Sequence, residues 1–209
     1  MIPPEAAREA IALVRQSIAA RLGVAPPPPP PSHPFLSQVQ PVFVTLYRHP
    51  PGSDERFLHG CIGSLAGLPL AQGIRQSAEQ AAFEDPRAAP LEPKHLGELE
   101  VEISLLSPFE PLVVQSEKEA LERLRPHKDG LLLSHNPPKG KERRALFLPS
   151  VWEKLPKPIE FLRALKQKAG LPPDFWDEHI TLKRFSTHSI RDPAPWTRPN
   201  GPGHRHLFA

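Results

Sequence analysis

The segment 57–63 (FLHGCIG) holds the only cysteine of the chain, two residues after a histidine and between two glycines. A thiolate is both a nucleophile and a soft metal ligand, so Cys61 is the first candidate for chemistry in this sequence. An extended strand sends successive side chains to opposite faces, which predicts that Phe57, His59 and Cys61 share one face. The Cα atoms of His59 and Cys61 would then lie about 6.6 Å apart, close enough for an imidazole to influence the thiol.

Two interpretations of this segment stay open. In the catalytic interpretation, the Cys61 thiolate attacks an electrophile or takes part in redox chemistry, and a protonated His59 lowers the thiol pKa. The backbone amides around Gly60 and Gly63 would stabilise developing negative charge. In the structural interpretation, Cys61 is a small buried hydrophobe and the glycines allow close packing or a turn. The sequence favours the structural interpretation, because it contains no recognisable Cys-His-Asn constellation, and it predicts no metal site.

The elements around Cys61 follow from hydrophobic periodicity and turn residues. Residues 42–47 are rich in β-branched and aromatic side chains, and a turn at 50–54 leads into a return strand over 56–62. A helix is expected to begin near Pro69 and to end at Asp85, because proline follows at position 86. Its predicted buried stripe consists of Leu70, Ile74, Ala78, Ala81 and Ala82.

Residues 99–105 alternate between apolar and polar side chains, which is typical of an antiparallel strand with one solvated face. Glu100, Glu102 and Ser104 are expected to lie on that solvated face. Two glutamates at this spacing could form an acid-base or metal pair. Exposure of one strand face explains them more simply.

The second half of the chain contains further periodic segments. A capping box opens a short helix, two strands flank the polar loop 136–141, and a second helix stops at Gly170 before a late strand. These elements are predicted at 116–124, 130–134, 144–148, 161–170 and 180–185. The basic residues of the hairpin could clamp a phosphate, but without the glycine spacing of a phosphate cradle they are expected to be solvated: Lys139, Lys141, Arg143 and Arg144.

Composition excludes several classes of protein. With 209 residues, 39% hydrophobic and 23% charged, the chain suits one globular domain with a small appended subdomain. The net charge of +3 is spread among acidic residues, so nucleic-acid binding is not favoured. A single cysteine excludes an intramolecular disulfide and fits a reducing compartment. No secretion signal and no apolar run of about 20 residues is found, which predicts a cytoplasmic protein that does not contact membranes.

Both ends of the chain differ in composition from the middle. A helix is predicted over 4–22, ending at Gly23, and an unbroken proline run follows at 26–31. The run is expected to be a linker or loop, with a ligand for an aromatic groove as the alternative. The tail 191–209 shows no helical or strand period and is expected to be a poorly ordered extension. His204 and His206 supply too few ligands for a metal site.

Several blocks, taken in order along the chain, resemble the AMMECR domain family, whose bacterial members are called AmmeMemoRadiSam system protein A. The resemblance spans about residues 40–188, and its order makes it more specific than any single motif. The blocks are FVTL (43–46), LHGCIGSL (58–65), PL (69–70), AAFEDPR (81–87), VEISLLS (101–107), DGL (129–131), FLPSVW (147–152) and KAGLP (168–172).

The resemblance implies an α+β fold, with a mainly antiparallel sheet flanked by helices and a smaller subdomain. It divides the chain into an N-terminal helix and proline-rich linker (1–39), an AMMECR-like domain (40–190) and a flexible proline-rich tail (191–209). By family analogy, Asp85 and Arg87 line the same cleft as Cys61. The chain departs from the family pattern at His59, where arginine is usual; a guanidinium is always charged, whereas an imidazole is charged only when protonated.

The family name also implies partners, a Memo-type protein and a radical SAM protein, without naming a reaction or a cofactor. The chain is therefore expected to be a cytosolic binding or accessory module that uses a glycine-rich cleft at Cys61, bordered by Gly60, Gly63, Asp85 and Arg87. The alternative is an enzyme in which Cys61 and His59 are catalytic.

Overall fold

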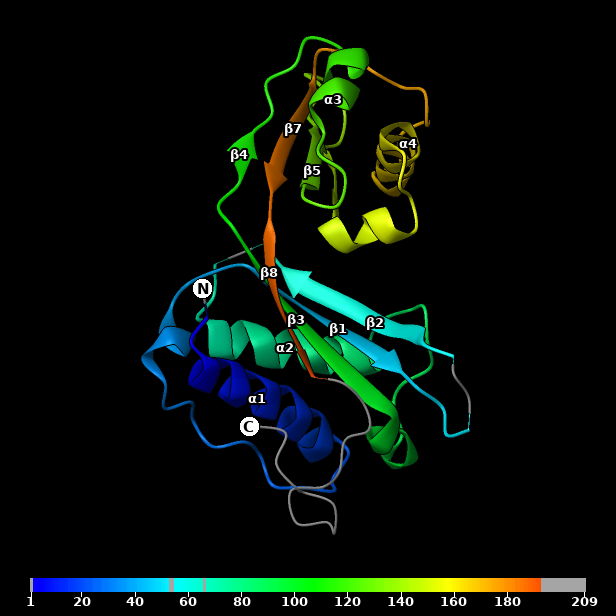
Figure 1. Cartoon of the computed structure of the whole chain (residues 1–209). Helices are drawn as coiled ribbons and strands as arrows, with labels where there is room; N and C mark the ends of the chain where they lie inside the picture. Colours follow the sequence, from blue (N-terminus) through cyan, green and yellow to red (C-terminus); the bar gives the residue numbers. More distant parts are fainter. Residues whose placement is uncertain (1, 53–54, 66, 193–209) are drawn as a thin grey trace. The chain divides into compact units, whose positions relative to one another are not determined.

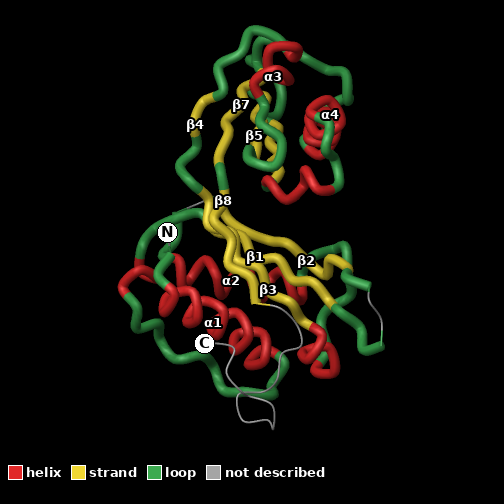
Figure 2. Tube along the Cα trace, in the orientation of Figure 1, coloured by secondary structure: helices red, strands yellow, loops and turns green. Residues whose placement is uncertain are grey.

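The computed structural model describes residues 2–52, 55–65 and 67–192, and it confirms the predicted α+β fold (Figure 1). The chain divides into two compact units. Unit 1 comprises Met1–Leu105 and the segment that begins at His188, and unit 2 comprises Leu106–Thr187. In the described part of the chain, each unit is built around a four-stranded, mainly antiparallel sheet (Figure 2).

In unit 1 the sheet has the strand order β2-β1-β3-β8, and two helices cover one of its faces (Figure 1). The strands are β1 (Val42–Arg48), β2 (Phe57–Ser64), β3 (Leu99–Leu106) and β8 (Thr187–Asp192), and the helices are α1 (Pro4–Arg21) and α2 (Leu70–Phe83). Alternate residues of β1, which are Val42, Val44 and Leu46, point into the helical layer and are buried. The buried stripe predicted for α2 is confirmed, because all five of its residues are at most 1% exposed.

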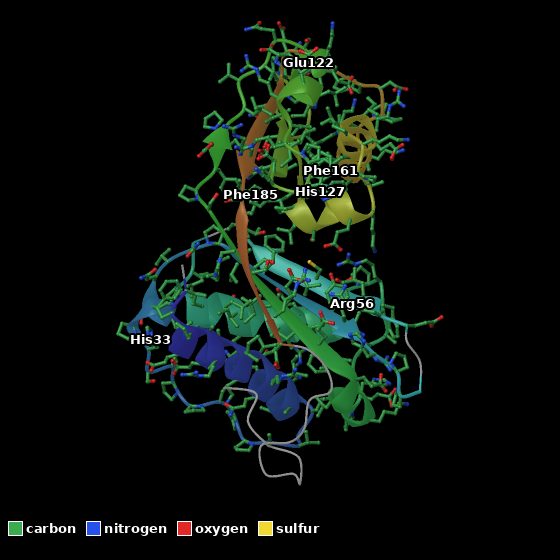
Figure 3. All side chains as sticks on the ribbon, viewed as in Figure 1. His33, Arg56, Glu122, His127, Phe161 and Phe185 are labelled. Atoms are coloured by element: carbon green, nitrogen blue, oxygen red, sulfur yellow. The ribbon has the colours of Figure 1, made fainter. Side chains whose placement is uncertain are left out.

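The polar side chains of β3 are buried, Ser104 among them at 3% exposed, so the prediction that they lie on a solvated face was wrong. Glu100 and Glu102 are 9% and 4% exposed. Arg56, labelled in Figure 3, donates to both oxygens of Glu100, and Arg191 donates to Glu102 at 3.1 Å. The alternation correctly places the two carboxylates away from the helices. They are buried because arginines from elsewhere in unit 1 cover them, one of these from β8.

Strand β8 and three short 3-10 helices were not predicted from the sequence. Residue 191 was assigned to the C-terminal extension, yet β8 continues to Asp192 and pairs with β3; the rest of that extension, 193–209, lies outside the described residues. The 3-10 helices are η1 (Pro34–Ser37), η2 (Pro93–Glu98) and η3 (Pro149–Glu153). No helix in residues 2–52, 55–65 and 67–192 is long and apolar enough to cross a bilayer.

Unit 2 contains a sheet with the order β4-β7-β5-β6 and its own hydrophobic core. At the centre of this core, the rings of Trp152 and Phe161 stack with centroids 3.9 Å apart. The predicted helices and strands are confirmed with small shifts of their ends: α3 (Glu117–Arg123), β5 (Gly130–His135), β6 (Arg143–Phe147), α4 (Pro158–Lys168) and β7 (Ile180–Phe185), beside the two-residue β4 (Glu110–Pro111).

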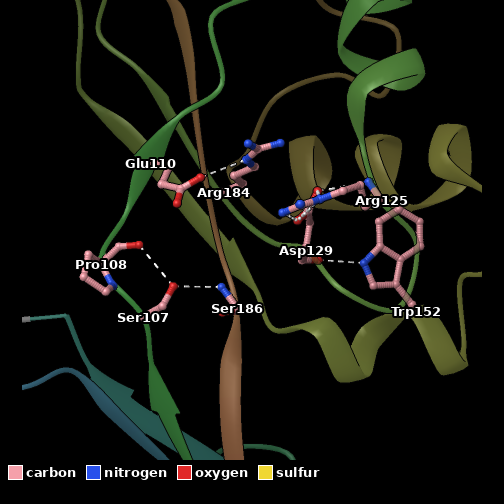
Figure 4. A network of polar contacts seen from close by, with 8 residues as sticks. All are labelled: Ser107, Pro108, Glu110, Arg125, Asp129, Trp152, Arg184 and Ser186. Carbon is pink, nitrogen blue, oxygen red and sulfur yellow. Dashed lines mark hydrogen bonds and ion pairs between the residues drawn. The ribbon is translucent and has the colours of Figure 1, made fainter.

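A buried carboxylate organises the chain where it enters β5 (Figure 4). The side chain of Asp129, 1% exposed, accepts from the N–H of Arg125 at 2.9 Å and from its guanidinium. The backbone carbonyl of Asp129 accepts from the Trp152 indole at 2.7 Å. These bonds hold a turn in which His127 has a φ of +62°. The DGL block at 129–131 therefore has a structural role in unit 2.

The basic residues of the β5–β6 hairpin are exposed, as predicted. Arg143 donates to the backbone carbonyl of Gly170, and Arg144 lies 3.7 Å from Glu142. The loop 136–141 joins the two strands of an antiparallel pair, as its turn residues indicated.

Candidate functional site

Cys61 lies on β2, at the edge of the unit 1 sheet, directly opposite Thr45 of β1. The Thr45 hydroxyl donates to the Cys61 sulfur at 3.2 Å. Thr45 points away from the helical layer, since its neighbours Val44 and Leu46 point into that layer. The half-buried thiol therefore lies on the polar face of the sheet, the same face as Glu102, which pairs with Thr45 from the other side.

His59 does not share this face, so the predicted Cys-His pairing was wrong. The register passes from Leu46 opposite Gly60 to Tyr47 opposite Leu58, which leaves His59 as the extra residue of a β-bulge. Its Nε2 lies 3.1 Å from the carbonyl oxygen of Ala82 at the end of α2. A bulge inserts one residue and shifts the alternation of side chains, so two residues at positions i and i+2 point to opposite faces.

The environment of His59 also opposes a cationic role. The side chain is buried, and this burial is the main cause that lowers its pKa. The carbonyl of Ala82 can only accept, so Nε2 carries the proton of a neutral ring. A neutral imidazole on the opposite face of the sheet cannot lower the pKa of the thiol as a protonated one beside it would.

Asp85 and Arg87, which follow the end of α2, hold the backbone of Cys61 (Figure 1 shows the elements). The Cys61 N–H donates to Asp85 Oδ2 at 2.9 Å, and Arg87 Nη2 donates to the Cys61 carbonyl at 3.1 Å. The same arginine donates to Asp85 Oδ1 through Nε at 2.8 Å. An edge strand leaves outward N–H and C=O groups without a neighbouring strand, and here an ion pair replaces that neighbour.

The Asp85–Arg87 ion pair affects the ionisation of the Cys61 thiol. The hydrogen bond from the Arg87 side chain is the largest cause that lowers the pKa of Asp85 far below its usual range, and the N–H groups of Cys61 and Arg87 add to it. The pKa of Arg87 is raised first by Asp85, and the Cys61 thiol contributes as well. Since such an interaction is mutual, Arg87 favours the thiolate of Cys61. The cation beside the thiol is Arg87 and not His59.

The two glycines of the segment meet packing requirements. A Cβ atom on Gly60 would lie 2.1 Å from the carbonyl oxygen of Ala81 in α2, and one on Gly63 would lie 2.3 Å from the Phe43 ring. In the ladder, residues next to Cys61 direct their N–H groups toward β1, so the amide of Gly60 is used in the sheet. The amide of Cys61 is bonded to Asp85 and does not face an open space as a free donor.

The structure thus brings together Cys61, Asp85 and Arg87, and separates His59 from them. Thr45 was missed, although the hairpin register would have placed it opposite Cys61. We call Thr45, Cys61, Asp85 and Arg87 the Cys61 site. Within the described residues, no group of three or more His, Cys, Asp or Glu side chains is arranged to hold a metal ion.

Known proteins match the sequence of this chain along both of its units. The profile of the AMMECR1 family matches residues 11–190. A protein of Thermococcus gammatolerans is 37% identical over 171 residues, which cover 78% of this chain and 77% of the relative. Protein MJ0810 of Methanocaldococcus jannaschii is 33% identical over 156 residues, or 73% of each chain. The names of these two relatives state no activity.

A solved structure extends this likeness to three dimensions. The crystal structure of the uncharacterized protein PH0010 from Pyrococcus horikoshii aligns with a TM-score of 0.79 at 30% sequence identity. The alignment covers 93% of this chain and 95% of that one.

Proposed function

Because this chain belongs to the AMMECR1 family, we propose that it is a binding or accessory module that acts with a Memo-type protein and a radical SAM protein. The contact would be made through the Cys61 site. One observation supports this most directly: the side chain of Arg87 is 51% exposed, yet it is held by bonds to Asp85 and to the backbone of an edge strand.

A held, exposed guanidinium suits recognition for two reasons. Arginine is enriched at protein interfaces, where its planar group bonds to carboxylates and carbonyls. Its side chain also loses little rotamer freedom on binding when the free protein already holds it in place. The proposed partners follow from the family resemblance, and the Cys61 site supplies the surface that they would contact.

Removing Arg87 tests this proposal. The purified chain is mixed with the Memo-type and radical SAM proteins of the same source, and complex formation is measured by size exclusion and calorimetry. Arg87→Ala is expected to weaken the complex about tenfold, the equivalent of about 1.4 kcal/mol. Cys61→Ser should leave the complex intact, because serine is close to cysteine in size and the backbone carbonyl of residue 61 that holds Arg87 is unchanged.

Arg163→Ala provides a matched control, because Arg163 is also half exposed (50%) and paired, in its case with Asp174 of unit 2. This variant should bind like the wild type. A chain that binds neither protein, or that binds equally well after Arg87→Ala, would refute the proposal.

A second candidate function is catalysis or redox chemistry by the Cys61 thiolate. The arrangement that favours it is the Thr45 hydroxyl at 3.2 Å from the sulfur, with Arg87 as a neighbouring cation. A hydrogen-bond donor and a positive charge both stabilise a thiolate, which is the reactive form of cysteine. The general base of such an enzyme would have to be a group other than His59.

Thiol alkylation separates this candidate from a purely structural cysteine. The rate with iodoacetamide is measured against pH for the folded and the unfolded chain. We expect an apparent pKa of Cys61 below the ordinary value of about 8.5, and slower alkylation at neutral pH in Thr45→Val, which keeps the shape and removes the donor. Labelling that becomes fast only after denaturation would contradict a reactive thiolate.

A further inference from the structure

The proline run 26–31 has only one backbone conformation available to it. Each proline holds φ near −65°, and a residue that precedes proline is excluded from the helical region. Every residue from 25 to 30 precedes a proline, so the whole run is an extended polyproline II helix. We call residues 26–31 the strap.

Both ends of the strap are held by α1. At its start, Gly23 ends the helix with a φ of +72°, and the N–H of Val24 donates to the Ala19 carbonyl at 3.0 Å. At its end, the Glu9 carboxylate accepts from the N–H of Ser32 at 2.6 Å and from the N–H of His33 at 2.9 Å (Figure 3 labels His33). The bond from Ser32 is the main cause that lowers the pKa of Glu9. The strap is therefore ordered before any partner arrives.

Over residues 25–30, exposure follows the threefold repeat of polyproline II. Ala25 and Pro28, three residues apart, are half buried, and Ala25 packs against the core of unit 1. The other prolines of residues 25–30 are exposed and form two rows of rings, of which Pro29 and Pro30 also border a groove: Pro26 and Pro29, Pro27 and Pro30. A linker has no need of such an ordered and exposed surface.

A cation lies beside these rings. A groove with a volume of about 550 Å³ runs between the strap and the helices of unit 1; its lining includes Pro28–Pro31, Leu13 and Leu36 and reaches Arg75 of α2. Arg75 is exposed, and among the residues that the structure describes no carboxylate pairs with it. Arg21 of α1, in contrast, is paired with Glu84 at 3.1 Å.

We propose that the strap and Arg75 form a docking surface for a partner domain that has an aromatic-lined groove with an acidic rim. Aromatic rings pack against proline rings, and indole or phenol donors bond to the carbonyls of a polyproline II helix. An acidic residue at the rim complements Arg75, which pairs with no carboxylate of the described residues. This inference does not depend on the Cys61 site, which lies on another element.

The test uses an isotope-labelled SH3 domain as the probe, since its groove is aromatic and its rim acidic, and the full chain as the titrant. Chemical shifts of the groove residues are expected to saturate. The double variant Pro27→Ala/Pro30→Ala should weaken binding about tenfold or more, because it removes one exposed row and loosens the helix. Arg75→Glu should weaken binding several-fold and make it less sensitive to salt.

Pro138→Ala is the matched control, because Pro138 is an exposed proline in the hairpin loop of unit 2. It should leave the affinity unchanged. Circular dichroism confirms that each variant is folded. A titration without saturation at the groove, or equal affinity of wild type and double variant, would overturn the inference.

Discussion

Replacing Gly60 with alanine is expected to unfold unit 1 under conditions in which the wild-type chain is folded. The added Cβ would lie 2.1 Å from the carbonyl oxygen of Ala81 and 2.9 Å from its carbonyl carbon. Both atoms belong to the backbone of α2, which cannot move aside as a flexible side chain can. Overpacking costs about 1–3 kcal/mol and more where backbone must shift, so we expect a loss of about 3 kcal/mol or more. That is a large share of the roughly 5–15 kcal/mol that stabilises a domain.

Urea unfolding followed by circular dichroism measures this loss, and Gly23→Ala is the matched control. Gly23 has a φ of +72°, but a Cβ there would meet no atom within 4 Å. Only the left-handed backbone opposes that change, at a cost of about 1 kcal/mol. If Gly60→Ala lost no more stability than Gly23→Ala, α2 would not lie against β2 at the distance described.

The pattern of hydrophobic residues in the sequence predicts the helices and strands well, because each of them needs an apolar face. The stripe from Leu70 to Ala82 identified α2, and the β-branched run at 42–47 identified β1. The direction of Glu102 was also predictable from alternation. Its burial was not, because its partner Arg191 is 89 residues away on a strand that shows no clear period. Contacts of that kind depend on the tertiary fold and leave no local signal.

In the candidate site, too, some features could be predicted from the sequence and others depend on the tertiary fold. Cys61 could be identified from its residue type, and Asp85 and Arg87 from the family resemblance, since their spacing alone gives no reason to place them at an edge strand. The face on which His59 lies could not be predicted. A β-bulge turns its side chain to the opposite face of the sheet, and this bulge depends on the pairing of β2 with β1. A hairpin register, had it been known, would have placed Thr45 beside the thiol.

Replacing Asp85 with asparagine is expected to destabilise unit 1 and, at the same time, to make Cys61 more reactive. The side chain of Asp85 is 2% exposed and accepts bonds from the Cys61 amide and the Arg87 guanidinium. Breaking a buried ion pair costs about 3–5 kcal/mol; since Arg87 is half exposed and regains water, we expect about 2–3 kcal/mol. Glu84→Gln, which alters the adjacent exposed pair with Arg21, should cost less than about 1 kcal/mol.

The stability difference should depend on pH in a defined direction. The folded-state pKa of Asp85 is depressed, so its contribution is fully present above the unfolded value of about 3.9 and is lost as the pH falls toward the folded value. The free energies of unfolding of wild type and Asp85→Asn should therefore differ by a constant amount from pH 7 to about pH 5. Below about pH 4 this difference should shrink progressively as the pH falls. A difference that persists unchanged at lower pH would show that the carboxylate charge is not its source.

In Asp85→Asn, the Cys61 thiol should become more reactive although the protein becomes less stable. The substitution removes a negative charge near Cys61 and leaves Arg87 without a competing carboxylate, so the apparent thiol pKa should fall and alkylation at neutral pH should become several-fold faster. Arg87→Ala should raise the thiol pKa and slow alkylation. A merely loosened edge strand would speed up labelling in both variants and leave the pH midpoint unchanged. Opposite shifts of the midpoint therefore identify the Asp85–Arg87 pair as the group that sets the ionisation of Cys61.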